Sequence, residues 1–141
     1  MNQGEVFELL RAAGYRLTGP RRQLVETLLA AEGPLTAEAL HQLVRPAGLN
    51  LSTVYRNLAS FCDLGWLEAV PGLGGERFYQ VRQPQSSSFS ILCLDCGRLN
   101  AVTGMSEAGL SEAVREHGFK PDDLRVTLAA HCGHVCEHKP G

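Results

Sequence analysis

Two pairs of closely spaced cysteines constrain this sequence more than any other feature. The first pair is Cys93 and Cys96, which are separated by two residues and followed by Gly97. The second pair is Cys132 and Cys136, and 35 residues lie between the two pairs. In a Cys-x-x-Cys-Gly turn both thiolates face one ion, the backbone amides point toward the sulfurs, and glycine permits the tight backbone. Two such pairs indicate a structural zinc ion held by four cysteines.

Other uses of these cysteines stay open at the level of sequence. Soft thiolates favour zinc over magnesium, calcium or manganese, but an iron–sulfur cluster also takes four cysteines. A thioredoxin-like redox pair is expected at a strand-to-helix junction, whereas this pair lies between two predicted strands. The thiols could also bind nothing. A site of three cysteines and one histidine is open too, because the second pair is surrounded by His131, His134 and His138.

Length and composition set the broad class. A chain of 141 residues has room for one large domain or two small ones, and its hydrophobic fraction of 44% suits a globular protein. No apolar run approaches the roughly 20 residues of a membrane span. The N-terminal segment lacks a basic start followed by an apolar stretch, so we expect no signal peptide. The expected location is the cytoplasm, where thiols stay reduced and clustered cysteines favour metal over disulfides.

Charge is distributed unevenly along the chain. The formal net charge is −2, so the chain as a whole does not attract nucleic acid. Four arginines nevertheless lie within twelve residues that contain no acid: Arg11, Arg16, Arg21 and Arg22. A small basic patch is sufficient for a DNA-binding module, because phosphate attraction is local and screened beyond about 10 Å at 0.1 M salt. A solvated helix face explains the same pattern equally well.

The first half of the chain predicts four short helices and a hairpin. Helices are expected over 2–13, from Thr18 to about Glu32, from Thr36 to about Pro46, and from about Thr53 to Leu64, with Asn2, Thr18, Thr36 and Ser52 as N-caps. Two strand-like runs follow, Trp66–Val70 and Arg77–Val81, joined by the turn residues PGLGGE. Residues 1–82 therefore predict a winged helix-turn-helix domain.

The second half predicts a separate small α/β domain. Residues 83–88 are polar and are interpreted as a hinge. Strands are expected at Ser90–Leu94, Leu99–Val102 and Leu124–Ala130, the last with one buried side, and Ser106 is expected to cap a helix that ends near His117. A domain over 89–141 has a small core, so we expect it to depend on zinc, which contributes on the order of 10 kcal/mol to such folds. The predicted fold class is α+β.

These residues resemble the ferric uptake regulator (Fur) family of bacterial metal-responsive repressors. The resemblance covers about residues 5 to 136. The matching stretches occur in family order, and they are GYRLTGPRRQLVETL, GPLTAEALHQLV, LNLSTVYRNLASFCDLGWLEAV, GGERFYQV and the two cysteine pairs. The resemblance implies an N-terminal winged-helix DNA-binding domain and a C-terminal dimerisation domain. It also implies a homodimer that binds an AT-rich palindromic operator in double-stranded DNA.

The resemblance also assigns DNA-contacting residues. It implies that Tyr55 and Arg56 enter the major groove and that Arg16 reaches the adjacent minor groove. The chemistry agrees, because an arginine binds guanine with two hydrogen bonds, and a narrow minor groove attracts a guanidinium. The Tyr55 ring could pack on a thymine methyl or bind phosphate. The candidate phosphate anchors are Ser52, Thr53, Asn57 and Arg21. Asn57 is expected to lean toward the inner face of its helix.

The ligand positions of the family's metal-sensing site hold other residues in this sequence. The histidine-rich run before the first cysteine pair falls on Ser86–Ser90, and the carboxylate after it falls on Leu99–Ala101. Three further ligand positions fall on Leu124, Pro34 and Tyr79. Divalent iron and manganese need imidazole and carboxylate ligands, which serine hydroxyls replace poorly. We therefore expect structural zinc without a recognisable iron or manganese sensing site.

Several functional hypotheses remain open. The leading one is a DNA-binding transcriptional repressor with fixed DNA affinity. The second is a zinc-type metal-responsive repressor with other ligands, for which the candidates are His41, His117, His131, His134, His138, Glu107, Glu137 and Cys62. Cys62 itself is interpreted as an inert thiol rather than a redox switch. A thiol-redox protein and an interaction module that does not bind DNA are the remaining alternatives. No nucleophile–base pair, phosphate loop or pair of acids supports an enzyme.

Overall fold

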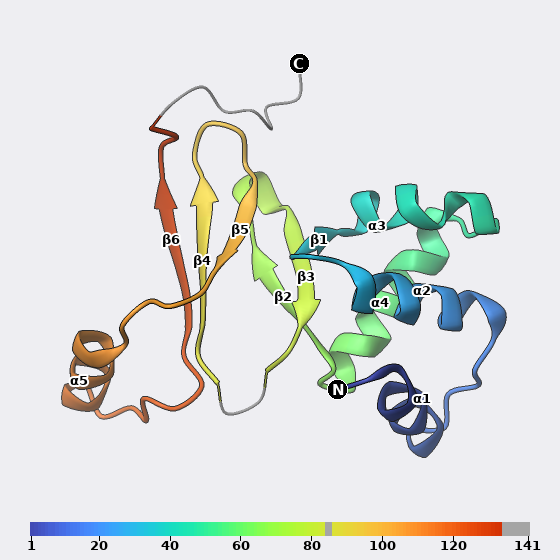
Figure 1. Ribbon diagram of the computed structural model, residues 1–141, viewed down its shortest axis with the longest axis horizontal. Coiled ribbons are helices and arrows are strands. Elements are labelled where there is room, and N and C mark those ends of the chain that lie inside the picture. The colour runs from blue at the N-terminus through green and yellow to red at the C-terminus, as the bar shows by residue number, and fades with distance from the viewer. Residues whose placement is uncertain (84–85, 134–141) are drawn as a thin grey trace. The chain divides into compact units, whose positions relative to one another are not determined.

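A computed structural model describes residues 1–83 and 86–133 of the chain. The chain divides into two compact units, Met1–Arg82 and Gln83–Gly141 (Figure 1). Cys136, His134, Glu137 and His138 lie outside the described residues, so the fourth predicted zinc ligand and most of the histidine-rich tail have no structural description. Within the described ranges, no helix combines the length and apolar character that crossing a membrane requires.

The first unit begins with four helices, and a capping residue was predicted for each of them. They are α1 (Gln3–Ala12), α2 (Gly19–Ala30), α3 (Ala37–Val44) and α4 (Leu51–Asp63). The side chains of Asn2, Thr18 and Thr36 accept hydrogen bonds from backbone amides three residues later, which confirms these three caps. A short 3₁₀ turn over Arg45–Ala47 follows α3.

The fourth predicted cap was wrong. Asn50, not Ser52, caps α4, and its Oδ1 accepts a hydrogen bond of 2.8 Å from the Thr53 amide. The helix therefore begins at Leu51, two residues earlier than predicted, and Ser52 lies exposed in its first turn. Both Asn and Ser are good N-caps, so local preference alone did not separate them.

A small antiparallel sheet completes the first unit. Its strands are β1 (Leu35–Thr36), β2 (Leu67–Pro71) and β3 (Arg77–Val81), in the order β1-β3-β2. The β2–β3 hairpin is the wing, and its turn contains Gly74 and Gly75, both with positive φ. That backbone conformation suits glycine because it has no Cβ atom. Together, the helices and the hairpin form the predicted winged helix-turn-helix.

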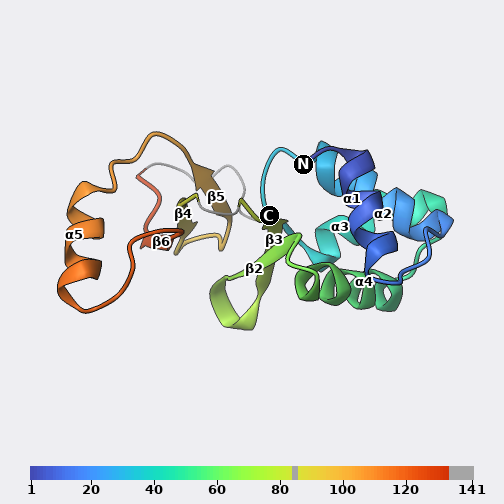
Figure 2. The ribbon, with the colours of Figure 1, turned by 90° about the horizontal axis from the view of Figure 1, so that it is seen from below.

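The main hydrophobic core belongs to the first unit. All four helices and the sheet contribute to it, and its fully buried large side chains include Leu10, Leu24, Leu40, Leu58 and Phe61. The Phe61 ring meets Trp66 edge to face, with centroids 5.1 Å apart. In α4 the predicted inward stripe of Val54, Leu58 and Phe61 is buried. This packing holds α4 against the other helices along one side only, as Figure 2 shows.

The second unit is a three-stranded mixed sheet with one helix. The strands are β4 (Ser88–Cys93), β5 (Leu99–Val102) and β6 (Arg125–Ala130), in the order β5-β4-β6. Strand β4 is antiparallel to β5 and parallel to β6, and α5 (Ala108–Glu116) lies in the β5–β6 connection. The helix begins after Glu107 without a side-chain cap bond, so the prediction that Ser106 caps it was wrong.

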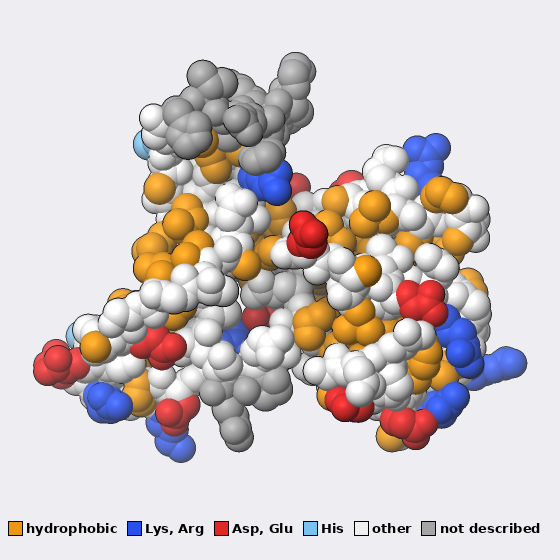
Figure 3. Space-filling view, in the orientation of Figure 1, with side chains coloured by type: hydrophobic (Ala, Val, Ile, Leu, Met, Phe, Trp, Pro, Cys, Tyr) orange, Lys and Arg blue, Asp and Glu red, His pale blue; other side chains and the backbone are white. Residues whose placement is uncertain are grey.

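Little of the second unit is buried within a single chain. Among its described residues the buried apolar side chains are Phe89, Leu92, Cys93 and Leu99. No residue of α5 is buried, and along β6 Leu128 is 44% exposed. The expectation that β6 buries one side is therefore wrong for the isolated chain. Hydrophobic side chains lie open on this sheet in Figure 3. An apolar surface of this kind marks a contact with another protein surface.

Candidate nucleic-acid interface and metal site

Helix α4 presents a polar outer face. Ser52, Tyr55, Arg56 and Ala59 are exposed and recur at the spacing of one helix face, opposite the buried stripe. Arg56 is exposed, and among the described residues its guanidinium makes one long contact, 3.5 Å, with the Thr53 hydroxyl. Arg56 is therefore available to a ligand at the helix surface. The exposed residues of this face have the size and chemistry to read base edges in a major groove.

Arg21 ties α2 to α4. Its Nε donates to Asn57 Oδ1 at 3.0 Å, and its Nη1 donates to the Arg16 carbonyl at 2.9 Å. The guanidinium carbon also lies 5.2 Å from the centroid of the Tyr15 ring. Asn57 is buried, as expected, and its amide nitrogen donates to the Thr53 carbonyl. Arg21 thus fixes the position of α4 relative to the turn that carries Arg16.

The other arginines of the basic segment are exposed. The Arg16 side chain makes no hydrogen bond or ion pair with the described residues, whereas Arg22 lies over the Phe7 ring and Arg11 pairs with Glu8. Figure 3 shows Lys and Arg side chains gathered over the connection between α1 and α2. The basic patch predicted from the sequence is therefore a real surface feature, and the Arg16 guanidinium in it is open to an anionic partner.

Sequence reasoning missed the partner of Tyr55. The Tyr55 hydroxyl donates to Glu38 Oε1 at 2.6 Å, and Glu38 lies in the first turn of α3. The two residues are 17 positions apart, so no local pattern in the sequence links them. This hydrogen bond places a carboxylate beside the outer face of α4.

The first cysteine pair forms the predicted turn. Cys93 is the last residue of β4, and the Cys96 amide points at its Sγ, with N and S 3.5 Å apart. Gly97 has φ +79° and donates to the Cys93 carbonyl at 2.8 Å. Amides that point toward sulfur and a left-handed glycine are the local features that a thiolate metal turn requires. The chemistry of this turn therefore fits a soft divalent metal such as zinc.

Asp95 joins the two cysteine regions and was not singled out from the sequence. Its Oδ2 accepts from the Cys132 amide at 2.7 Å, and its Oδ1 lies 3.0 Å from His131 Nδ1. The Leu94 amide also donates to the Ala130 carbonyl, so β6 delivers Cys132 to the first turn. In residues 1–83 and 86–133 alone, no three His, Cys, Asp or Glu side chains converge as a metal site. Three of the predicted zinc ligands, Cys93, Cys96 and Cys132, lie in those ranges and form no such group, and Cys136 lies beyond them.

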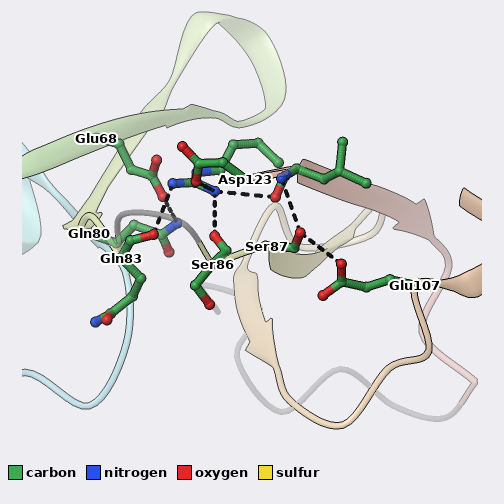
Figure 4. Close-up of polar contacts among 9 residues, drawn as sticks. Glu68, Gln80, Gln83, Ser86, Ser87, Glu107 and Asp123 are labelled. Atoms are coloured by element: carbon green, nitrogen blue, oxygen red, sulfur yellow. Dashed lines mark hydrogen bonds and ion pairs between the residues drawn. The ribbon is translucent and has the colours of Figure 1, made fainter. Parts of the chain in front are cut away.

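The serine segment before β4 is bonded within the second unit. Ser87 Oγ donates to Glu107 Oε2 at 3.0 Å and accepts from the Leu124 amide at 3.1 Å. Arg125 Nη1 donates to the Ser86 carbonyl at 2.8 Å and pairs with Asp123 at 2.6 Å (Figure 4). Ser88 already pairs with Arg125 in the sheet. The role of residues 83–88 as a hinge stays a prediction.

The positions at which the resemblance implied sensing ligands lie close together in pairs. Ser87 and Leu124 are joined by the hydrogen bond just described. In the first unit, Leu35, the residue after Pro34, pairs with Tyr79 across β1 and β3. Ser87 and Leu124, which were identified separately along the sequence, therefore meet in space, and Pro34 is next to the strand partner of Tyr79. The side chains at the four implied ligand positions, which are Ser87, Leu124, Pro34 and Tyr79, are not ligands that divalent iron or manganese prefers.

Comparisons with known proteins agree with this architecture. The model of the Ferric uptake regulator family matches residues 12–129. The chain belongs to the ferric uptake regulator family. The "Ferric uptake regulation protein" of Synechococcus elongatus is 30% identical over 128 residues, which span 87% of each protein.

Solved structures of related proteins show the same fold. The ferric uptake regulator of Vibrio cholerae has 26% identity and a TM-score of 0.76, covering 89% of this chain and 98% of that protein. The Pseudomonas aeruginosa regulator with manganese has 27% identity and a TM-score of 0.72, covering 95% and 100%. A zinc-bound manganese uptake regulator has 28% identity and a TM-score of 0.70, covering 89% and 96%.

Membership of the family sets the broad function. The chain is a DNA-binding transcription regulator and not an enzyme. Regulators of this family bind DNA, bind metals and function as dimers. The expected fold class is also confirmed, with a DNA-binding winged helix before a small dimerisation domain.

Proposed function

We propose that this regulator is a homodimeric repressor that binds an AT-rich palindromic operator and has no iron- or manganese-sensing site. A structural zinc ion held by Cys93, Cys96, Cys132 and Cys136 completes its second unit. The exposed, outward-facing Arg56 on α4 is the observation that carries the proposal. Because DNA is bound in the cytoplasm of a bacterial cell, we expect the protein to act there.

Specific recognition is assigned to the two exposed residues at the centre of α4. Arg56 reads guanine with its free guanidinium, and Tyr55 lies beside it on the same face. Arg16 enters the narrow minor groove next to the site, where the negative potential of AT-rich DNA is strongest. Ser52 and Thr53 contact phosphate at the N-terminus of α4, where the helix dipole favours an anion. Arg21 is assigned a phosphate contact only through the guanidinium nitrogen not used in its two hydrogen bonds.

The structural zinc is supported by the local geometry of three of the four cysteines. The amide-to-sulfur contact at Cys93 and the left-handed Gly97 form a thiolate turn, and Asp95 links that turn to the Cys132 backbone. Zinc bound there would fasten β4 to the end of β6. A unit with so few buried side chains gains most of its stability from such a link.

The proposal that the regulator lacks a metal switch is supported by the contacts of the residues at the expected sensing position. The Ser87 hydroxyl is used in two hydrogen bonds, to Glu107 and to the Leu124 amide. The adjacent positive charge is the guanidinium of Arg125, which is paired with Asp123. Arg125 Nη1 also donates to the Ser86 carbonyl, so polar groups of this segment are used within the protein.

The decisive experiment combines metal analysis with DNA binding. We expect one zinc per chain after purification, and binding of a promoter duplex that is unchanged when iron or manganese is added or removed at constant zinc. Arg56→Ala should abolish specific binding while leaving the fold intact, because Arg56 makes only one long contact within the described part of the chain. The exposed Arg45→Ala, at the end of α3, is the matched control. Iron-dependent binding, or two zinc ions per chain with zinc-dependent binding, would reject the proposal in favour of a metal-responsive repressor.

A further inference from the structure

The contact between Tyr55 and Glu38 places a carboxylate beside a residue that is proposed to contact DNA. Tyr55 is 44% exposed and lies in the second turn of α4, beside Arg56. Glu38, in the first turn of α3, accepts a hydrogen bond from the Tyr55 hydroxyl at an O–O distance of 2.6 Å. Short hydrogen bonds to a carboxylate are among the stronger ones in proteins. A carboxylate is unexpected at a surface that must approach an anionic duplex.

The protonation states of the two groups are well defined. The hydrogen bond from Tyr55, followed by a backbone hydrogen bond, lowers the pKa of Glu38 below its ordinary value. The same contact, followed by burial, raises the pKa of Tyr55 above its ordinary value. At neutral pH the carboxylate is therefore ionised and the phenol keeps its proton, which it donates to Glu38. A phenol has only one proton to donate.

This geometry limits how Tyr55 can meet DNA. A phosphate oxygen is an acceptor, so it would need the one hydroxyl proton that Tyr55 already directs at Glu38. A phosphate that displaced Glu38 would bring two anions together at the end of the ring, which is unfavourable. The ring face and edge stay open to an apolar partner. Of the two roles left open by the sequence, the contact thus favours ring packing on a base over binding of phosphate.

The surroundings of Tyr55 add to this effect. A shallow groove of about 600 Å³ lies between α3, α4 and the wing, beside the Tyr55 ring. It is lined by two carboxylates, from Glu38 and Glu76, and by one guanidinium, from Arg77. Its charge does not attract a phosphate strand. The exposed Arg56 and Arg16, by contrast, have no carboxylate partner among the described residues.

We propose that Glu38 is a positioning residue for DNA recognition, which holds the Tyr55 ring toward the thymine methyl group and keeps phosphate away from its hydroxyl. Glu38 acts through Tyr55 and touches no base itself. The inference rests on the proposed DNA-binding role of α4, and it adds a residue from a different helix to the recognition surface. It makes Glu38 a determinant of sequence preference.

The test uses DNA selected by the protein itself. The full-length dimer selects duplexes from a random-sequence library, and each thymine of the selected duplex is then replaced in turn by uracil, which lacks the methyl group. At one thymine per half-site the wild-type protein should lose about fourfold in affinity, the equivalent of one buried methyl group. Tyr55→Ala should bind thymine and uracil duplexes equally.

Variants at position 38 then separate the roles. Glu38→Ala should lose most of the thymine-over-uracil preference and should bind random duplex more tightly, because an anion has been removed. Glu38→Gln keeps an acceptor for Tyr55 and should retain the preference. Glu76→Ala, which removes the other carboxylate of the groove, is the matched control and should also retain it. Thermal unfolding of each variant checks that the fold is intact.

Each outcome has a distinct meaning. If Glu38→Ala keeps the full thymine preference, the positioning role is wrong. If Tyr55→Phe weakens binding to selected and random duplexes alike, the Tyr55 hydroxyl contacts phosphate and the inference is also wrong. If the wild-type protein selects no duplex at all, the proposed DNA-binding role fails first. A selected duplex without any uracil effect leaves DNA binding in place and overturns only this inference.

Discussion

Arg21 shows how a residue predicted to bind DNA also serves the fold. Its guanidinium is shared between the buried Asn57 amide oxygen, the Arg16 carbonyl and the Tyr15 ring. Arg16, five positions earlier, keeps its side chain free of such contacts within the described part of the chain. Two arginines of one basic segment are thus expected to contribute differently, one to the position of α4 and one to the ligand.

Substitution by methionine should separate the two arginines. Arg21→Met leaves the buried Asn57 oxygen without its donor, so the free energy of unfolding should fall by about 1–3 kcal/mol. Arg16→Met should change it by less than about 0.5 kcal/mol, because the side chain is exposed, yet should weaken operator binding. Urea unfolding and DNA titration of the same samples measure both quantities. A stability loss in Arg16→Met equal to that in Arg21→Met would contradict this assignment.

At the scale of elements, the start of α4 decides the role of Ser52. Asn50 caps the helix, and Ser52 lies with Tyr55 and Arg56 on the outer face, whereas Val54 and Leu58 face the core. Leu51 and Ser52 thus belong to the helix, and the Ser52 hydroxyl is not used as the cap. The apolar stripe, rather than the cap, sets which face of the helix is buried.

Removal of each candidate cap tests this assignment directly. Asn50→Ala should lower the free energy of unfolding by about 1 kcal/mol, because an amide at the helix start loses its acceptor. Ser52→Ala should leave stability within about 0.5 kcal/mol and should affect only DNA affinity. Chemical denaturation monitored by circular dichroism compares the two variants. The reverse order of stabilities would show that Ser52 is the cap after all.

At the scale of the whole molecule, stability is divided between two units that are built differently. The first unit has one core shared by four helices and a sheet, and none of the four predicted zinc ligands belongs to it. The second unit buries few apolar side chains and leaves Leu110, Phe119 and Leu128 exposed. It therefore depends on what is added to it, which we take to be zinc and a second copy of the chain.

Metal removal should affect the two units unequally. Trp66 is the one tryptophan of the sequence and lies in the core of the first unit, so its fluorescence reports on that unit alone. A strong chelator should melt the second unit and dissociate the dimer, while the Trp66 signal keeps its native transition. Fluorescence and sedimentation of the same sample provide the measurement. Concerted loss of both signals on chelation would show that the units do not fold independently.

Much of the fold could be predicted because its signals are local. Three of the four helix caps, the wing hairpin and the Cys93–Gly97 turn each depend on residues a few positions apart. The contacts that shape the recognition surface have no such signal, since Arg21 and Asn57 are 36 residues apart, and Glu38 and Tyr55 are 17 apart. Burial of β6 also could not be judged locally, because it depends on what covers the sheet.

The sequence by itself determined the elements of this protein, the chemistry of its cysteine turn and the family to which it belongs, because capping, periodicity and ligand spacing act over a few residues. Only the tertiary structure decided which arginine is held within the described residues and which is not, that the Tyr55 hydroxyl donates its hydrogen bond to Glu38, and that Asp95 joins the two cysteine regions. Those outcomes depend on side chains from distant segments, whose meeting is fixed by packing of the whole core.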